Sequence, residues 1–265
     1  MKKMEVLQKV QKLQVTAEAV LCLALDIGEG MLKSGGEVSR VESTVERICR
    51  AYGAVHVEVF SIISMINATV HMADGSQSAQ MRRIRTTGTD MYRLELLNAL
   101  SREICQSTPD IAAANLRVRE AKRQLAYPKW AALPASAAAA SMFAVFFGGG
   151  VIEALAALLI GALVGAIDLL AANRVNELAK TVVAAFVAGI LSSLSAVLIR
   201  SADSGIIMIG TIMLLVPGVA FGTALRDLLC GDLIAGGLKT VQACLAALMI
   251  AFGYLLSMAV MGGAV

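Results

Sequence analysis

Apolar positions in the first half of the chain follow helical spacing before they switch to alternation. Residues 20–32 have helical periodicity, and Ser34 to Gly36 follow them with the glycines that often stand just past a helix C-terminus. A second apolar stripe at i, i+4, i+7 and i+11 is formed by Val41, Val45, Ile48 and Tyr52. The pattern therefore predicts two helices joined by a short glycine turn.

The middle of this half is predicted to form a small sheet. Apolar and polar residues alternate over 55–60 and again over 66–72, as in half-buried strands. An Asp-Gly turn signal at 74–75 precedes a third strand. Helical spacing returns over 94–104, and a last helix is expected over 109–125. Helices before and after three strands indicate an α+β layer with a short antiparallel sheet.

The second half is far more apolar. Of the 23 Lys and Arg and the 20 Asp and Glu in the chain, residues 129–265 hold six of each. A membrane-spanning helix needs about 20 apolar residues, and five stretches qualify. These stretches are 130–147, 151–172, 181–199, 205–229 and 234–260. We therefore predict an α-helical membrane protein, with a cytosolic α+β domain at 1–128 and five transmembrane helices in a domain at 129–265.

Lys and Arg in the short loops predict the orientation of these helices. The segment before the first span is basic, with Arg117, Arg119, Lys122, Arg123 and Lys129. The glycine loop at 148–150 carries no basic residue, whereas Arg174 and Lys180 flank the next loop and Arg200 stands beside Asp203 in the following one. We expect a multi-pass protein of the plasma membrane with a cytoplasmic N-terminal domain and the C-terminus outside. No cleaved signal peptide is expected, and a net charge of +3 gives no reason to expect a nucleic-acid partner.

One carboxylate falls inside an apolar stretch. Asp168 shares a helix face with Gly161 and Gly165, small residues that let membrane helices approach closely. An intramembrane carboxylate is costly to hold there, so an inward-pointing Asp168 is a candidate carrier of a coupling proton. The alternative is an interface carboxylate paired with Arg174.

Pro217 and Gly218 interrupt the fourth apolar stretch. Proline removes a backbone donor and clashes with the preceding turn, and such an opening at membrane depth needs a protein or water-filled lining. A helix that restarts near Val219 would direct its positive end at an acidic substrate group. A kinked helix without a ligand is the alternative.

A possible metal site lies in the predicted sheet. If the first two strands turn near 63–64, His56 faces His71 across the strands and Glu58 shares their face, a set that could bind zinc. The solvated face of the sheet explains the same residues, so we expect neither a metal nor a cofactor.

Two stretches, taken in order, resemble the threonine/serine exporter family. The first stretch runs from Gly28 to Glu42 and reads GEGMLKSGGEVSRVE. The second contains Leu215-Val216-Pro217-Gly218, Arg226-Asp227-Leu228-Leu229, Gly231-Asp232 and Gly236. With the soluble-then-spans layout, the resemblance covers nearly the whole chain.

The resemblance implies a secondary exporter of small polar metabolites, typically threonine or serine, and in some relatives dicarboxylates such as succinate. It places Arg226, Asp227 and Asp232 at the cytoplasmic mouth, where Arg226 and Asp227 would pair with each other or hold a zwitterion. The family also has long forms with a second membrane domain, and this chain resembles the large subunit of split systems. We therefore expect no enzyme but a hetero-oligomer with a short membrane protein. A membrane-anchored metal-dependent hydrolase and a ligand sensor are the rival hypotheses.

Overall fold

A computed structural model describes residues 16–124, 127–171, 175–199 and 201–262. The chain divides into two compact units, one of residues 1–126 and 219–240 and one of residues 127–218 and 241–265. The predicted transition near residue 128 lies close to the first of these boundaries. The second boundary between the two units falls after Gly218, and the third boundary lies inside the last helix.

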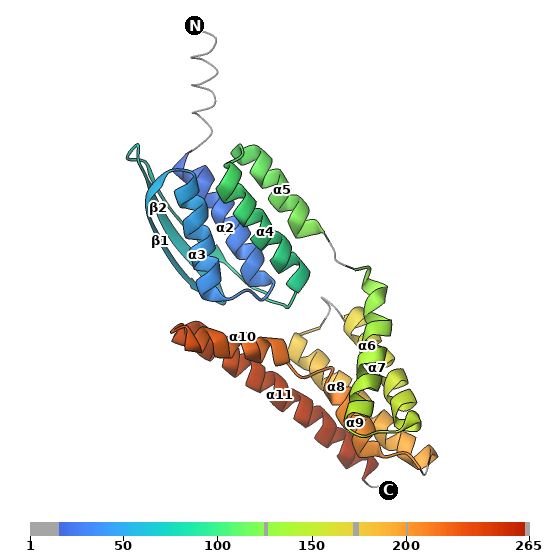
Figure 1. The fold of residues 1–265 in the computed structure, drawn as a ribbon. Coiled ribbons are helices and arrows are strands. Elements are labelled where there is room, and N and C mark those ends of the chain that lie inside the picture. Colours follow the sequence, from blue (N-terminus) through green and yellow to red (C-terminus); the bar gives the residue numbers. More distant parts are fainter. Residues whose placement is uncertain (1–15, 125–126, 172–174, 200, 263–265) are drawn as a thin grey trace. The chain divides into compact units, whose positions relative to one another are not determined.

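The first unit is an α+β layer (Figure 1). Its elements are α2 (Ala17–Lys33), α3 (Val38–Ala51), β1 (Ala54–Ile62), β2 (Met65–Met72), β3 (Gln77–Arg83), α4 (Met91–Ser107) and α5 (Ile111–Arg123), followed much later by α10 (Gly218–Leu229) and the start of α11 (Leu233–Met261). Helices α2 and α3 pack on one face of the sheet, and α4 and α5 pack against α2.

The sheet has the antiparallel order β1-β2-β3. Ile62 pairs with Met65, so the first hairpin turns at residues 63–64, and His56 lies directly opposite His71. Both features of the predicted register are confirmed. At the second turn, the side chain of Asp74 accepts hydrogen bonds from the backbone and hydroxyl of Ser76 at 2.9 and 2.6 Å.

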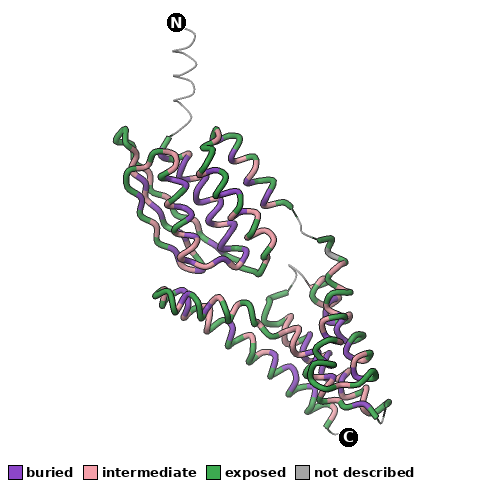
Figure 2. The backbone as a smooth tube through the Cα atoms, viewed as in Figure 1, coloured by how far each residue is buried: buried purple, intermediate pink, exposed green. Residues whose placement is uncertain are grey.

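The core of the first unit is built from large aliphatic side chains. Figure 2 shows buried positions recurring along α2, where Leu21, Leu25 and Ile27 are fully buried. The other face of the sheet carries exposed side chains, both polar and apolar, among them Glu58, Phe60 and Met81. Ala235 of α11 belongs to the same core, so the start of α11 packs as part of this unit.

The second unit consists of apolar helices. Its elements are η1 (Lys129–Ala131), α6 (Ala132–Phe146), α7 (Val151–Ala171), α8 (Glu177–Leu198), α9 (Ser204–Ile212) and the remainder of α11. By length and composition, α7, α8 and α11 could each cross a membrane. Helix α6 is apolar but, at 15 residues, shorter than the stretch 130–147 predicted to contain it.

The expected fourth span is not a single helix. Helix α9 ends at Ile212 and α10 begins at Gly218, so the apolar stretch 205–229 is divided into helices of 9 and 12 residues. The sequence pattern located the break but did not show that both pieces fall below spanning length. Among the described residues, three helices are long and apolar enough to span a membrane, and the predicted count of five stays a prediction.

Candidate functional site

The turn between α2 and α3 is fixed by its backbone. Gly35 has φ +88°, which L side chains rarely adopt, and the N–H of Gly36 donates to the carbonyl of Met31 at 2.9 Å. The segment before α4 supports this turn, since Gly88 donates to Lys33 and Asp90 to Ser34. The turn thereby presents the carbonyl of Gly36 and the side chain of Glu37, which precedes α3.

A second tight turn joins α10 to α11. Gly231 has φ +94°, and the N–H of Asp232 donates to the carbonyl of Asp227 at 2.9 Å. This closing bond satisfies one of the carbonyls that the end of α10 leaves free. The reversal brings Lys239, on the second turn of α11, alongside Asp227.

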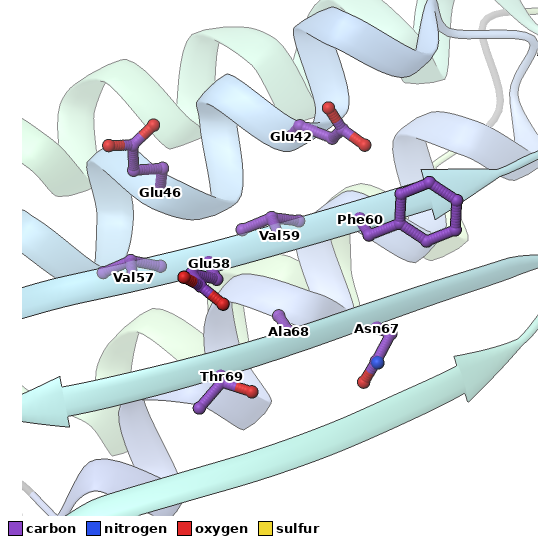
Figure 3. A pocket seen from close by; sticks show the side chains of 9 residues that line it. All are labelled: Glu42, Glu46, Val57, Glu58, Val59, Phe60, Asn67, Ala68 and Thr69. Carbon is purple, nitrogen blue, oxygen red and sulfur yellow. The ribbon is translucent and has the colours of Figure 1, made fainter.

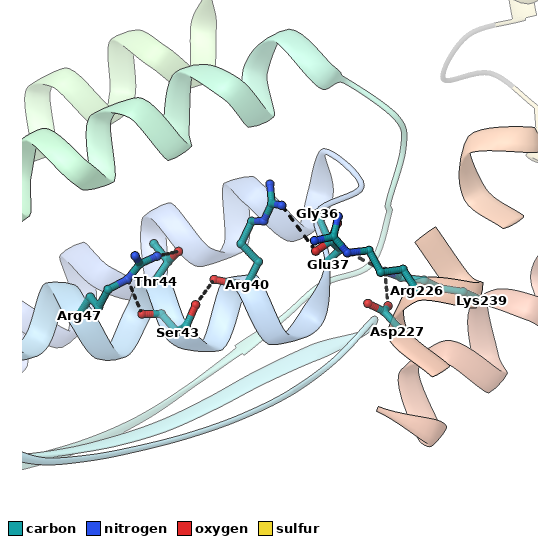
Figure 4. Close-up of polar contacts among 9 residues, drawn as sticks. All are labelled: Gly36, Glu37, Arg40, Ser43, Thr44, Arg47, Arg226, Asp227 and Lys239. Carbon is teal, nitrogen blue, oxygen red and sulfur yellow. Dashed lines mark hydrogen bonds and ion pairs between the residues drawn. The ribbon is translucent and has the colours of Figure 1, made fainter. Parts of the chain in front are cut away.

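The two turns meet within the first unit through ion pairs (Figure 4). Arg226 Nη1 lies 2.8 Å from Glu37 Oε1, and Lys239 Nζ lies 2.6 Å from Asp227 Oδ2. Lys239 also donates to the carbonyl of Gly36 at 3.3 Å. We call these five residues the junction. It joins the two sequence stretches that carry the family resemblance.

The junction differs from the expected arrangement in its partners. Arg226 and Asp227 do not pair with each other; each pairs with a residue outside its own stretch of helix. The side chain of Asp227 is 1% exposed, whereas that of Arg226 is 58% exposed, so they lie on different faces of α10. Simultaneous binding of one zwitterion by both is therefore geometrically disfavoured.

Carboxylates gather behind the junction. Asp227 Oδ1 and Asp232 Oδ2 are buried and have no hydrogen-bond partner among the described residues. Glu42 of α3 accepts hydrogen bonds from the backbone and hydroxyl of Ser61 at 2.6 and 3.1 Å. Burial raises the pKa of Glu42, the hydrogen bonds from Ser61 oppose this shift, and the negative charge of Asp232 adds to it.

The interruption at Pro217 is a stretch of irregular backbone between α9 and α10. After Ile212 the chain makes turn-type bonds, from Leu215 to Ile212 at 2.8 Å and from Gly218 to Val216 at 2.8 Å. Helix α10 restarts at Gly218, within one residue of the predicted restart. The structure therefore supplies the predicted break in the helix, and its role in binding stays a prediction.

Asp168 lies at the end of α7 and does not point inward. Its side chain is 64% exposed and pairs at 2.5 Å with Lys180, which also contacts Glu177. The expected glycine face instead packs on α6, where Gly161 meets Ala140. Arg174, the expected partner in the alternative interpretation, lies outside the described residues, as do Arg200 and Val265.

The histidine pair on the sheet has the predicted neighbours. The His56 and His71 ring centroids lie 5.8 Å apart, and His56 Nε2 lies 3.2 Å from Glu58 Oε1. Within the described part of the chain, no three His, Cys, Asp or Glu side chains are grouped closely enough to hold a metal ion. His56, Glu58 and His71 form a polar patch on the exposed face of the sheet.

A cavity of about 510 Å³ opens along β1. Figure 3 shows Glu42 and Glu46 reaching toward it from α3, with Glu58 and Phe60 on the strand below. The cavity therefore shares Glu42 with the carboxylates behind the junction.

Several polar residues in the site were not singled out from the sequence. Glu37 and Lys239 complete the junction. The only available signals were the Gly231 turn, which brings α11 back along α10, and the resemblance that includes Glu37. In the second unit, Thr211 Oγ1 lies 3.2 Å from the Tyr254 hydroxyl, both buried, just before the helix break. Apolar periodicity gives no indication of such a pair, because a hydroxyl in a membrane helix often bonds to its own backbone.

The chain belongs to the threonine/serine exporter family, which it matches over residues 22–261. It is also 26% identical over 245 residues to a protein of Mycobacterium tuberculosis named "Probable threonine/serine exporter". That alignment covers 90% of this chain and 46% of the relative, so the chain spans about half the length of the relative. No solved structure matches the chain. The family resemblance inferred from the two sequence stretches is thus confirmed.

Proposed function

We propose that this chain is a membrane subunit of a secondary exporter for small polar metabolites, with hydroxylated amino acids such as threonine and serine as substrates. The observation that carries the proposal is the junction, in a chain that belongs to this family. Glu37 and Arg226, which are 189 positions apart and lie in the two stretches of the family resemblance, form a direct ion pair there. A membrane anchor or a hydrolase has no need for such a link between a soluble layer and a hairpin of apolar helices.

In the proposed topology, residues 1–128 are cytoplasmic, 129–265 form the membrane domain and the C-terminus is outside the plasma membrane. The Lys and Arg bias of the loops supports this orientation. Five crossings would require α6 to span with its flanking residues, and α9 and α10 to cross as one broken element. Reporter fusions at Gly149 and Val265 should both behave as external. A cytoplasmic reporter at Gly149 would contradict the topology.

The proposed substrate site is the irregular backbone at Pro217 and Gly218. Backbone groups freed at a broken helix, together with the start of α10, can hold a substrate carboxylate without a basic side chain. Replacing both residues by alanine should restore a continuous helix and abolish substrate binding. Normal binding by this double variant, with normal membrane insertion, would remove the break from the pathway.

Asp168 is the proposed proton carrier. A proton on Asp168 would cancel its attraction to Lys180 and leave this lysine paired with Glu177 of α8, which would link protonation to movement of α7 against α8. Proton-driven antiport follows if substrate and proton favour opposite-facing states. Asp168→Asn should keep exchange of substrate for substrate and lose the response to a proton gradient. A fully gradient-driven Asn variant would mean that Asp168 is only an interface residue.

A partner subunit completes the proposal. Large apolar side chains remain exposed on every long helix of the second unit, among them Leu159, Leu170, Leu198 and Leu248. Lipid covers part of this surface, and we propose that a short membrane protein covers the rest. Alternating access commonly moves one bundle against another, which a second subunit would supply.

The test is export from vesicles that contain the purified chain, with and without a co-encoded short membrane protein. The substrate panel contains threonine, serine and succinate. We expect threonine or serine export that requires both subunits. Succinate export alone would favour the dicarboxylate alternative. Full-rate export by this chain alone would contradict the partner, and no export of any substrate would contradict the proposed function.

A further inference from the structure

Two buried carboxylate oxygens at the α10–α11 turn call for a ligand. Asp227 Oδ1 and Asp232 Oδ2 have no hydrogen-bond partner among the described residues, and the side chain of Asp227 is 1% exposed. Buried side-chain polar atoms nearly always have a partner, so each exception requires an explanation. An ionised carboxylate only accepts hydrogen bonds, so its missing partner must be a donor or a cation.

The nearby lysine does not supply that partner. Lys239 Nζ is already engaged by Asp227 Oδ2 and by the carbonyl of Gly36. Arg226 is held by Glu37. The backbone bond from Asp232 to Asp227 ties the two unpartnered carboxylates to the same turn. Both residues with a free carboxylate oxygen therefore belong to the same tight turn.

The side chains around this turn also carry more negative than positive charge. Glu42, whose pKa is raised by burial and further by the charge of Asp232, adds a third carboxylate to the one lysine. A buried charge without a partner is costly to hold, which favours uptake of a positive charge. The described residues offer no three-ligand group for a metal ion, and this favours a monovalent cation over a divalent one.

We propose that Asp227 Oδ1 and Asp232 Oδ2 bind a compact monovalent cation, either a primary ammonium group or a sodium ion. An ammonium group matches the site because it donates to several acceptors from one centre. Only the source of such an ammonium, the amino group of an exported amino acid, rests on the proposed function. The binding of the cation does not.

The experiment measures thermal unfolding of the full chain in detergent at one fixed pH. Methylammonium chloride and sodium chloride are compared with tetramethylammonium chloride, which has the same charge but no N–H donor and a larger radius. We expect a melting temperature about 2–4 °C higher in at least one of the first two salts. L-threonine and N-acetyl-L-threonine form a second pair, in which only the first carries an ammonium group.

Three variants assign the effect to the turn. Asp232→Asn keeps the side-chain size and the Asp227–Lys239 pair, and should abolish the salt-specific rise. Asp227→Asn should do the same, and Asp74→Asn, at an exposed hairpin, should keep the rise. A rise with threonine but not with N-acetyl-threonine would identify an amino-acid ammonium, and a rise with sodium alone would identify an inorganic ion.

Equal melting in all salts and amino acids would overturn the proposal, as would a rise that survives in Asp232→Asn. Because no transport is measured, a chain that binds the cation but exports nothing would refute the proposed function and leave the site standing. A chain that exports threonine without any salt-specific rise in melting temperature would refute the cation site and leave the proposed function standing.

Discussion

The two units of this chain bury opposite kinds of residue. In the first unit, large side chains such as Leu21, Leu25 and Ile48 are completely buried. In the second, the buried positions are mostly small, and large ones such as Phe146 and Leu170 are 79% and 74% exposed. In water, large apolar side chains are driven inward. In lipid that drive is absent, and small residues that let helices approach closely provide the packing.

Buried glycine, alanine and hydroxyl residues show how the second unit packs. Gly161 lies against Ala140 of α6, and Gly189 faces Tyr254 and Ser257 of α11. The small residues therefore mark helix contacts, not weak points. The same small residues would make a poor core in the first unit. Which residues stabilise a core therefore depends on whether water or lipid surrounds it.

The largest expected effect comes from truncating a core leucine of the first unit. Leu25→Ala should lower the free energy of unfolding by about 2–5 kcal/mol, because it removes buried methyl groups and leaves a cavity. The same truncation at Leu170, exposed on α7, should cost at most about 0.5 kcal/mol. Hydrogen exchange of α2 and α7 amides in the intact protein measures both. Equal losses in the free energy of unfolding at the two sites would contradict the proposed difference between the two units.

Adding one methyl group to a helix contact should have a smaller effect on the free energy of unfolding, because it crowds the contact instead of leaving a cavity. In Gly161→Ala, the new Cβ would lie 2.6 Å from the Ala140 Cβ and 2.8 Å from the Ser136 carbonyl, so α6 and α7 must separate. We expect a loss of about 1–3 kcal/mol. Gly222→Ala on α10, whose Cβ would have no neighbour within 4 Å, is the matched control and should stabilise by about 0.4–1 kcal/mol.

Denaturant unfolding in detergent measures both glycine variants. If Gly161→Ala were as harmless as Gly222→Ala, close packing of small residues would not be what holds α6 to α7.

The smallest effect concerns a carboxylate in each unit. Glu153 of α7 is satisfied by the backbone N–H groups of Gly150 and Asp203, at 2.8 and 3.1 Å. Glu42 instead has a raised pKa, chiefly from burial. A raised folded-state pKa favours the protonated form. The stability it contributes is therefore present below the unfolded pKa, about 4.3, and is lost as pH rises through the folded value.

The pH dependence is tested by comparing the wild type with Glu42→Gln, which cannot ionise. The stability of the wild type relative to the variant should fall as pH rises from about 4 and then level off. Thermal unfolding across this range measures the difference. A difference that does not change with pH, or that grows in favour of the wild type, would contradict the assignment.

The sequence predicted the elements better than their long-range contacts. Alternation along β1 and β2 was enough to place His56 opposite His71, because a hairpin with a short turn fixes its own register. The Pro217 interruption was visible for the same reason, since proline acts on its own backbone.

The failures have a common physical cause. The proline located the break within 205–229, but hydropathy does not show that both pieces are short helices. Helical spacing placed Asp168 inward, whereas its neighbour Lys180, on the following helix, draws it outward. Likewise, the pairing of Arg226 with Glu37 spans 189 positions and leaves no local trace. Only the family resemblance brought those two stretches together before the structure did.

The central claim is that the junction between the α2–α3 turn and α10 operates in export. It is tested most directly by exchanging the charges of Glu37 and Arg226 and measuring threonine efflux from vesicles that contain this chain and the proposed partner. Glu37→Arg and Arg226→Glu alone should each slow efflux by about three- to tenfold, and the double exchange should restore most of the rate. Wild-type efflux from both single variants, or no recovery in a normally inserted double variant, would contradict the account.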